Sequence, residues 1–261
     1  MVYPDKGYIG CFEMADMDIG KRQLEAYTRE LLAAGHRRVI APINGDTWHS
    51  YRLVSWSGGE AAFPLEPQNP LWYNDVYKAC GYKPLKRYSS DAFYIGGEAE
   101  PRGGVHAPGK RGFLDGDLLL RGFRDGSDIR TIYDISLRGF DDNFLYSEIS
   151  YEAFEMLYKP FLPSIDSDLA IIAEIGGKPA GFMFSYVSGG RLILKTIAVL
   201  PDFRGRGVGA AMVGQVVQAG RAKGLRTAIA ALIAEGNNSF NIISKYGSDK
   251  IREYTLYYYE D

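Results

Sequence analysis

The chain has 261 residues, of which 46% are hydrophobic and 24% are charged, and its formal net charge is -2 at pH 7. This is an ordinary globular composition, and the length suits one large domain or two small ones. The near-neutral charge argues against nucleic acid or an acidic membrane surface as a partner.

The first 96 residues alternate between strand and helix patterns. Short apolar runs predict the strands. Leu24, Tyr27 and Leu31 lie at helical spacing in the first predicted helix, and Gly35 and Gly81 end the two helices. The expected elements, in order, are a strand at 8–13, a helix at 21–34, a strand at 38–41, a helix at 74–79 and a strand at 88–95.

Residues 97–112 are rich in glycine and proline and have no apolar period. Such a stretch is typical of a linker or long loop. It predicts one domain at 1–96, a linker at 97–112 and a second domain at 113–261, which are ordinary domain sizes.

The C-terminal part has ten expected elements, which predict a mixed α/β fold of the α+β type with a mixed sheet. Ser127 is the expected cap of its first helix. The elements are a strand at 118–123, helices at 127–140 and 150–158, strands at 169–174, 180–187 and 192–199, a helix at 208–223, a strand at 227–233, a helix at 239–245 and a strand at 252–259.

Two parts of the chain share a weak internal similarity. A helix, a glycine, an arginine two residues later and a strand follow one another at 34–40 and again at 223–229. Gly81 precedes Tyr88 by the same spacing as Gly247 precedes Tyr254. This similarity indicates a duplicated unit, although helix–glycine–strand joins are also common in unrelated α/β proteins.

The most informative segment is 196–211, where an apolar strand runs into a glycine-rich loop and a helix then begins. Gly205, Gly207 and Gly209 alternate with other residues, and Arg204 and Arg206 lie among them. The backbone N–H groups of such a loop and of the helix N-terminus form an anion site. Glycine allows a phosphate to approach the backbone, and arginine adds charge-assisted donors.

Two other phosphate-binding patterns fit less well. A P-loop needs Gly-Lys-Ser/Thr, whereas Gly209 is followed by two alanines. A Rossmann fingerprint drawn from Gly205 to Ala210 needs an acidic residue about 20 positions later. None lies between Asp202 and Glu235, so a dehydrogenase is only a distant alternative.

The pattern Arg-x-x-Gly-x-Gly at 204–209, preceded by Ala-Val-x-Pro at 198–201, resembles motif A of the GNAT superfamily, the GCN5-related N-acetyltransferases. The resemblance implies that acetyl-CoA is a cosubstrate. The loop amides and first arginine of the family hold the pyrophosphate, and the preceding strand holds the pantetheine arm. The implied cofactor-binding residues are Ile197, Ala198, Val199, Arg204, Gly205, Arg206, Gly207, Val208, Gly209, Ala210 and, from a motif B match, Asn238.

The resemblance also implies a reaction in which an amine attacks the thioester directly, with the Val199 amide polarising the thioester carbonyl. Many members carry a carboxylate base on the strand before the loop, where this chain has Lys195. Glu235 is therefore the candidate base, or else an exposed loop acid. Ile243 stands where many members carry the tyrosine that protonates the thiolate, so Tyr246 is the candidate acid, or else a packed aromatic.

The N-terminal part resembles the back half of a second GNAT unit, because 77–82 resembles motif B. Where its glycine loop belongs, residues 14–21 include Asp16 and Asp18, which would repel a pyrophosphate. We predict tandem GNAT-like domains, a complete C-terminal one and a partial, degenerate N-terminal one. The polar-aromatic stretch 41–52 is either part of an acceptor site or a packed loop.

Together these patterns predict an N-acyltransferase that moves an acetyl group from acetyl-CoA to a small-molecule amine acceptor. The alternative is a non-catalytic CoA-binding sensor or interaction protein, because the usual tyrosine and strand carboxylate are missing. Cys11 and Cys80 are far apart and form no cluster with a histidine, so we expect no metal. We also expect a cytoplasmic monomer or homodimer, with no signal peptide or membrane span.

Overall fold

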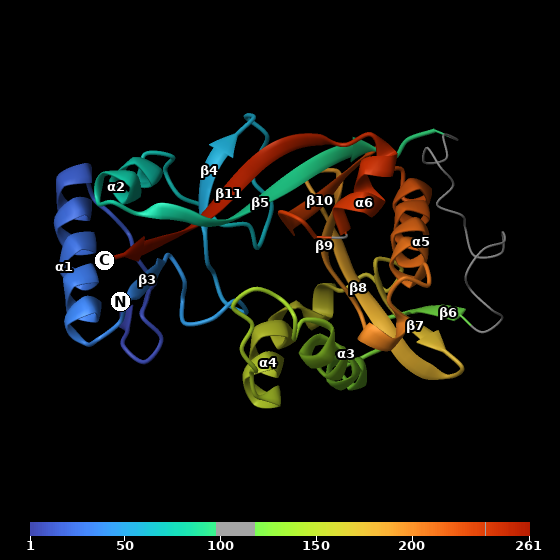
Figure 1. Cartoon of the computed structure of the whole chain (residues 1–261). Helices are drawn as coiled ribbons and strands as arrows, with labels where there is room; N and C mark the ends of the chain where they lie inside the picture. Colours follow the sequence, from blue (N-terminus) through green and yellow to red (C-terminus); the bar gives the residue numbers. More distant parts are fainter. Residues whose placement is uncertain (98–117, 238) are drawn as a thin grey trace. The chain divides into compact units, whose positions relative to one another are not determined.

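The computed structural model describes residues 1–97, 118–237 and 239–261, and the chain divides into two compact units (Figure 1). Unit 1 consists of Met1–Ser90, Leu232–Gly236 and Lys250–Asp261. Unit 2 consists of Asp91–Ala231 and Asn237–Asp249. The chain therefore leaves unit 1 along one strand and returns to it near its C-terminal end.

Unit 1 contains two helices and a mixed sheet. The final strand pairs antiparallel with both β3 and β4, and β2 pairs parallel with β3. The elements of this unit are β1 (Val2–Tyr3), β2 (Tyr8–Ile9), α1 (Met17–Ala33), β3 (Arg38–Ala41), β4 (Leu53–Ser57), α2 (Tyr73–Ala79), most of β5 (Lys83–Tyr94) and nearly all of β11 (Asp249–Glu260).

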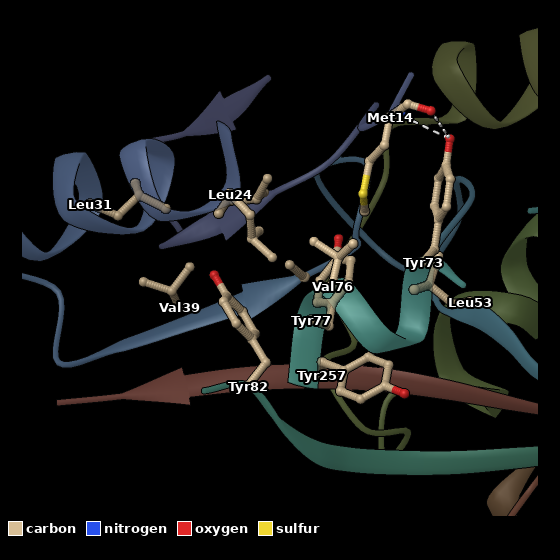
Figure 2. Close-up of a cluster of buried hydrophobic side chains, with 12 residues drawn as sticks. Met14, Leu24, Leu31, Val39, Leu53, Tyr73, Val76, Tyr77, Tyr82 and Tyr257 are labelled. Carbon is tan, nitrogen blue, oxygen red and sulfur yellow. Dashed lines mark hydrogen bonds between the residues drawn. The ribbon is translucent and has the colours of Figure 1, made fainter. Parts of the chain in front are cut away.

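Figure 2 shows the apolar core of unit 1, and this core explains why the domain boundary differs from the prediction. Tyr257 of β11 is 2% exposed and stacks on Tyr77 of α2, with ring centroids 5.3 Å apart. Without β11 this core would be open to water, so the last strand groups with unit 1 and not with a domain at 113–261. Apart from Gly97, the predicted linker at 97–112 lies outside the described residues.

The start of α1 also differs from the sequence pattern. The Asp16 carboxylate accepts a hydrogen bond from the Ile19 backbone N–H at 2.7 Å and so caps the helix. Side-chain oxygens of this kind satisfy N–H groups that have no acceptor within the helix. The helix therefore begins at Met17, one turn before the predicted start at residue 21.

The two helix–glycine–strand joins close with the same backbone geometry. Gly35 has φ +96° and Gly224 has φ +80°, which glycine adopts without strain. The next residue donates its N–H five residues back in both joins, from His36 to Leu31 and from Leu225 to Gly220, at 3.2 and 3.0 Å. These matched turns agree with the duplication indicated by the sequence.

Unit 2 has the element order that the sequence predicts. Strands β6 to β9 pair antiparallel in succession, and β10 pairs parallel with β9. The elements of this unit are β6 (Leu118–Gly122), α3 (Ser127–Gly139), α4 (Tyr151–Tyr158), η1 (Lys159–Ser164), β7 (Ala170–Ile175), β8 (Lys178–Ser188), β9 (Arg191–Val199), η2 (Pro201–Phe203), α5 (Val208–Ala222), most of β10 (Thr227–Ala234), α6 (Ser239–Ile243) and η3 (Ser244–Tyr246).

The mixed α/β fold class predicted from the sequence is therefore confirmed. Two details differ: Gly126 precedes the first turn of α3 in the place expected for Ser127, and the helix expected at 239–245 ends at Ile243 before a 3₁₀ turn. Across the described ranges, no helix is both long and apolar enough to cross a membrane.

Candidate functional site

The site begins where strands β9 and β10 of unit 2 stop pairing. Their parallel ladder has only three residue pairs and ends at Leu194 and Ala230, whereas β9 continues to Val199. From Thr196 to Val199, β9 pairs with β8 on one edge and has no β10 ladder partner on the other among the described residues. An unpaired strand edge presents N–H and C=O groups that can bind an extended ligand.

The backbone direction along β9 shows which residues present those groups. The Leu200 N–H donates to the Ala180 carbonyl of β8 at 2.9 Å. Because strand residues alternate, Ala198 also directs its backbone toward β8, while Ile197 and Val199 face the open edge. Of the three predicted pantetheine-binding residues, only Ile197 and Val199 are therefore placed to bind through the backbone.

The glycine loop follows β9 and η2 and is exposed. Gly205 and Gly207 have φ +75° and +85°, in the left-handed region that other residues avoid. No heavy atom lies within 4 Å of the position that a Cβ would occupy at either residue. The loop therefore needs glycine for its backbone conformation, and its outer face is open.

Helix α5 starts at the end of this loop without a capping side chain. Gly207 is its N-cap, and its first turn contains no acidic residue. The Ala211 N–H bonds to the Gly207 carbonyl at 2.9 Å, so the N–H groups of Val208, Gly209 and Ala210 precede the first intrahelical bond. Together with the positive end of the helix dipole, these donors form an anion site at an exposed loop.

The two loop arginines have different surroundings. Arg204 turns back toward α3: its guanidinium donates to the Val199 carbonyl at 3.2 Å, to the Gly139 carbonyl at 2.9 Å and to the Asp142 carboxylate at 2.5 and 3.1 Å. The Arg204 hydrogen bond lowers the pKa of Asp142 below its ordinary value. Arg206 is exposed, with its guanidinium carbon 5.6 Å from the centroid of the Phe203 ring.

These contacts change the interpretation of Arg204. Its guanidinium fixes the end of β9 and the loop to the C-terminal end of α3, so in this structure it is a positioning residue and not an open phosphate ligand. Arg206 is the loop arginine whose charge is available to an anion. Asp142 was not identified from the sequence, because its pairing with Arg204 depends on tertiary structure.

The predicted acid does not lie at this loop. Tyr246 packs on Phe93 with ring centroids 4.9 Å apart, and burial raises its pKa, while Arg221 has the smaller, opposite effect. Arg221 lies 13 residues along α5 from Val208, which is about 20 Å of helix. Tyr246 is thus near the far end of α5.

Glu235 belongs to unit 1 and is exposed. Its backbone N–H donates to the Arg87 carbonyl at 3.0 Å, and its carbonyl accepts from the Lys86 ammonium at 2.8 Å. Ile243, which takes the usual tyrosine position, is buried with 4% exposure. Asn238 lies outside the described residues.

An apolar pocket lies on the α3 side of β8 and β9. Among the described residues, its only polar lining side chains are the Thr196 and Tyr158 hydroxyls. Such a pocket accommodates hydrocarbon and disfavours an ammonium group. Its lining residues are Ile129, Ile132, Tyr158, Phe161, Ile165, Phe182, Phe184 and Thr196.

Part of the chain matches a known protein family. Residues 130–242 match the model of the acetyltransferase (GNAT) family. A Methanocaldococcus jannaschii protein, described as an uncharacterized N-acetyltransferase, is 29% identical over 109 residues, which are 39% of this chain and 46% of that protein. The chain therefore matches less than half the length of this relative.

Two solved structures share the fold. A GCN5-related N-acetyltransferase from Sphaerobacter thermophilus aligns with a TM-score of 0.60 at 14% identity, over 92% of this chain and 66% of that one. A tandem GNAT protein from the clavulanic acid biosynthesis pathway aligns with a TM-score of 0.52 at 12% identity, over 95% of this chain and 71% of that one. The tandem arrangement predicted from the sequence is thus also found in a solved protein.

Proposed function

Because the chain belongs to the GNAT superfamily, we propose that it is an N-acetyltransferase that moves an acetyl group from acetyl-CoA to the amine of a small acceptor. The general assignment to acyl transfer follows from the family. The acetyl donor and the small amine acceptor are the proposed part.

The observation that carries this proposal is the uncapped N-terminus of α5 behind an open glycine loop. The amides of 205–210 are the donors for the pyrophosphate of CoA. Arg206 adds a charge-assisted contact, and Arg204 holds the loop against α3 through Asp142. A pyrophosphate carries the charge and the acceptor oxygens that this arrangement lacks.

The open edge of β9 supports the pantetheine part of the proposal. Ile197 offers its backbone N–H and C=O, and Val199 its N–H, in the direction where β10 no longer pairs; the Val199 C=O already accepts from Arg204. The amides of the pantetheine arm can bind there as a short added strand does. The Val199 N–H remains the proposed donor that polarises the thioester carbonyl, a form of oxyanion stabilisation.

The reaction forms one bond and breaks one. The acceptor nitrogen bonds to the thioester carbonyl carbon, the carbon–sulfur bond breaks with its electron pair on sulfur, and the amine loses a proton. Glu235 is the proposed base, directly or through water. Tyr246 packs toward the far end of α5, so we propose that the thiolate takes its proton from water. Positioning of the two reactants then supplies much of the rate.

A CoA-binding protein without chemistry is the second candidate function. The observation in its favour is that β9 carries Lys195 in place of a strand carboxylate, while buried Ile243 stands in place of the usual tyrosine. Both candidates need the same CoA site, and they differ only in turnover.

The test is release of free CoA thiol from acetyl-CoA by the purified full-length chain, measured with a thiol reagent across a panel of small primary amines. We expect at least one amine to raise thiol release well above the amine-free rate. If acetyl-CoA binds but no amine raises the rate of thiol release, the non-catalytic alternative holds. If acetyl-CoA does not bind, both candidates fail.

A further inference from the structure

Arg52 in unit 1 is a buried arginine with an unusual backbone. Only 9% of the surface of this residue is exposed, and its φ is +72°. Its N–H donates to the Pro42 carbonyl at 2.9 Å, which holds it at the start of β4. A non-glycine residue in the left-handed region is strained, and such residues cluster at functional sites.

The guanidinium of Arg52 lies in a corner made by two tyrosine rings. Its central carbon is 4.1 Å from the ring centroid of Tyr51 and 4.1 Å from that of Tyr88. The two rings are nearly perpendicular, at 82°, and Tyr254 adds a third ring at 6.0 Å. Aromatic faces attract a cation through their ring quadrupole, but they carry no net negative charge.

The buried carboxylate of unit 1 pairs with Arg252 and not with Arg52. The buried charged side chains of this unit are Arg52, Arg252 and Glu66, two cations and one anion. The Glu66 carboxylate accepts hydrogen bonds from the Arg252 guanidinium, the Tyr254 hydroxyl and the Phe63 N–H. Both of its oxygens therefore already have donors other than Arg52.

Arg52 itself has unused donors. Its Nε and Nη1 are buried and have no hydrogen-bond partner among the residues that the structure describes. A buried charge is costly unless it is paired, and its donors add the cost of lost hydration. The arrangement therefore lacks one anion with acceptor oxygens.

We propose that Arg52, Tyr51 and Tyr88 form a binding site for the carboxylate of a small ligand, separate from the CoA loop and independent of the proposed function. A carboxylate supplies one negative charge for one guanidinium, and its two oxygens match the planar fork of arginine. A phosphate carries more charge than a single buried arginine balances. The tyrosine rings are suited to a flat or apolar group beside the carboxylate. Because Nε and Nη1 are buried, the ligand reaches them only when the half-buried Tyr51 ring moves aside.

The test is a thermal unfolding scan of the full-length chain in 20 mM sodium benzoate, with benzamide as the neutral isostere and sodium phosphate at equal ionic strength. We expect benzoate to raise Tm by several degrees and the other two to leave it unchanged. An Arg52→Met variant removes the unbalanced charge, and it should lose the benzoate response. No benzoate response in the wild type, or an equal response in Arg52→Met or with phosphate, would overturn the proposal.

A second variant keeps the test decisive if Arg52→Met does not fold. Arg52→Lys retains the charge but not the planar fork, so we expect calorimetry to give at least tenfold weaker benzoate binding. Equal affinity for the wild type and Arg52→Lys would contradict a carboxylate held by the guanidinium. Acetyl-CoA binding, measured on the same samples, reports on the CoA loop separately.

Discussion

Helices α1 and α5 are corresponding helices of the two GNAT-like units, and their first turns differ in one decisive way. The Asp16 carboxylate caps α1, and Asp18 adds a second acid to its first turn. Helix α5 begins at Gly207 with neither a capping side chain nor an acid. The first helix satisfies its own N-terminus, whereas the second leaves its N–H groups for a ligand. We propose that acidic residues at this position distinguish a degenerate unit from a binding one.

The most direct way to break this contrast is to give α5 the cap that α1 has. Gly207→Asp places a carboxylate beside the proposed pyrophosphate, where charge repulsion at about 4 Å is worth up to about 4 kcal/mol. We expect acetyl-CoA binding to weaken by at least about 100-fold, or about 2.7 kcal/mol. Isothermal titration measures this loss.

The matched control is Gly207→Asn, which has the same shape and tolerates the same left-handed backbone but carries no charge. It should lose far less affinity than Gly207→Asp. Equal losses in the two variants would mean that backbone strain, and not the charge at the helix N-terminus, controls binding.

Arg204 tests how much of the loop depends on its attachment to α3. Arg204→Ala removes hydrogen bonds to Val199, Gly139 and Asp142. We expect acetyl-CoA affinity to fall by about tenfold or more, which is at least about 1.4 kcal/mol. Asp142→Asn should reproduce part of this loss, since Asp142 reaches the loop only through Arg204. A change below about threefold in Arg204→Ala would contradict the loop assignment.

Removing the cap of α1 in unit 1 should lower stability and leave the affinity for acetyl-CoA unchanged. Asp16→Ala removes the cap of α1, which costs about 1 kcal/mol in comparable helices. We expect a lower Tm and an unchanged acetyl-CoA affinity. Asp16→Asn keeps a capping oxygen, so its Tm should stay near that of the wild type. A large change in CoA affinity in either variant would mean that the α1 N-terminus takes part in binding.

The smallest expected effect is the pH dependence of the Arg204–Asp142 pair. The hydrogen bond from Arg204 lowers the pKa of Asp142 from 3.8, so its stabilisation is complete above about pH 4 and is lost as the pH falls through the lower, folded value. Because Asp142 is exposed, we expect only about 0.5 kcal/mol. The Tm difference between the wild type and Asp142→Asn should be present at pH 6 and shrink as the pH falls below about 4, and a difference that did not change with pH would contradict the pairing.

The sequence predicted the fold class, the element order of unit 2 and the glycine loop because these depend on local patterns. Strand alternation, helical spacing and the run of glycines at 205–209 are all visible in a short window. The domain boundary could not be predicted in this way. Lys250–Asp261 joins unit 1 because Tyr257 packs on Tyr77, a contact between residues 180 positions apart.

The details of the site show the same limit. The sequence identified Arg204 and Arg206 but could not separate them, because only the structure shows that Arg204 is bound to Asp142 and Gly139. Tyr246 was the candidate acid because Ile243 takes the position of the usual tyrosine, and its ring packs against Phe93. The polar-aromatic stretch 41–52 was noticed as a pattern, but the unbalanced charge of Arg52 depends on what Glu66 already binds.

The central claim is that the α5 N-terminus and its glycine loop bind the pyrophosphate of CoA. The most direct measurement is a ³¹P NMR titration of CoA with the full-length chain, in which the pyrophosphate and the 3′-phosphate give separate signals. We expect the pyrophosphate signals to shift or broaden with the wild type and to stay unchanged with Gly207→Asp. Pyrophosphate signals that are unaffected by the wild type, or affected equally by both proteins, would contradict the claim.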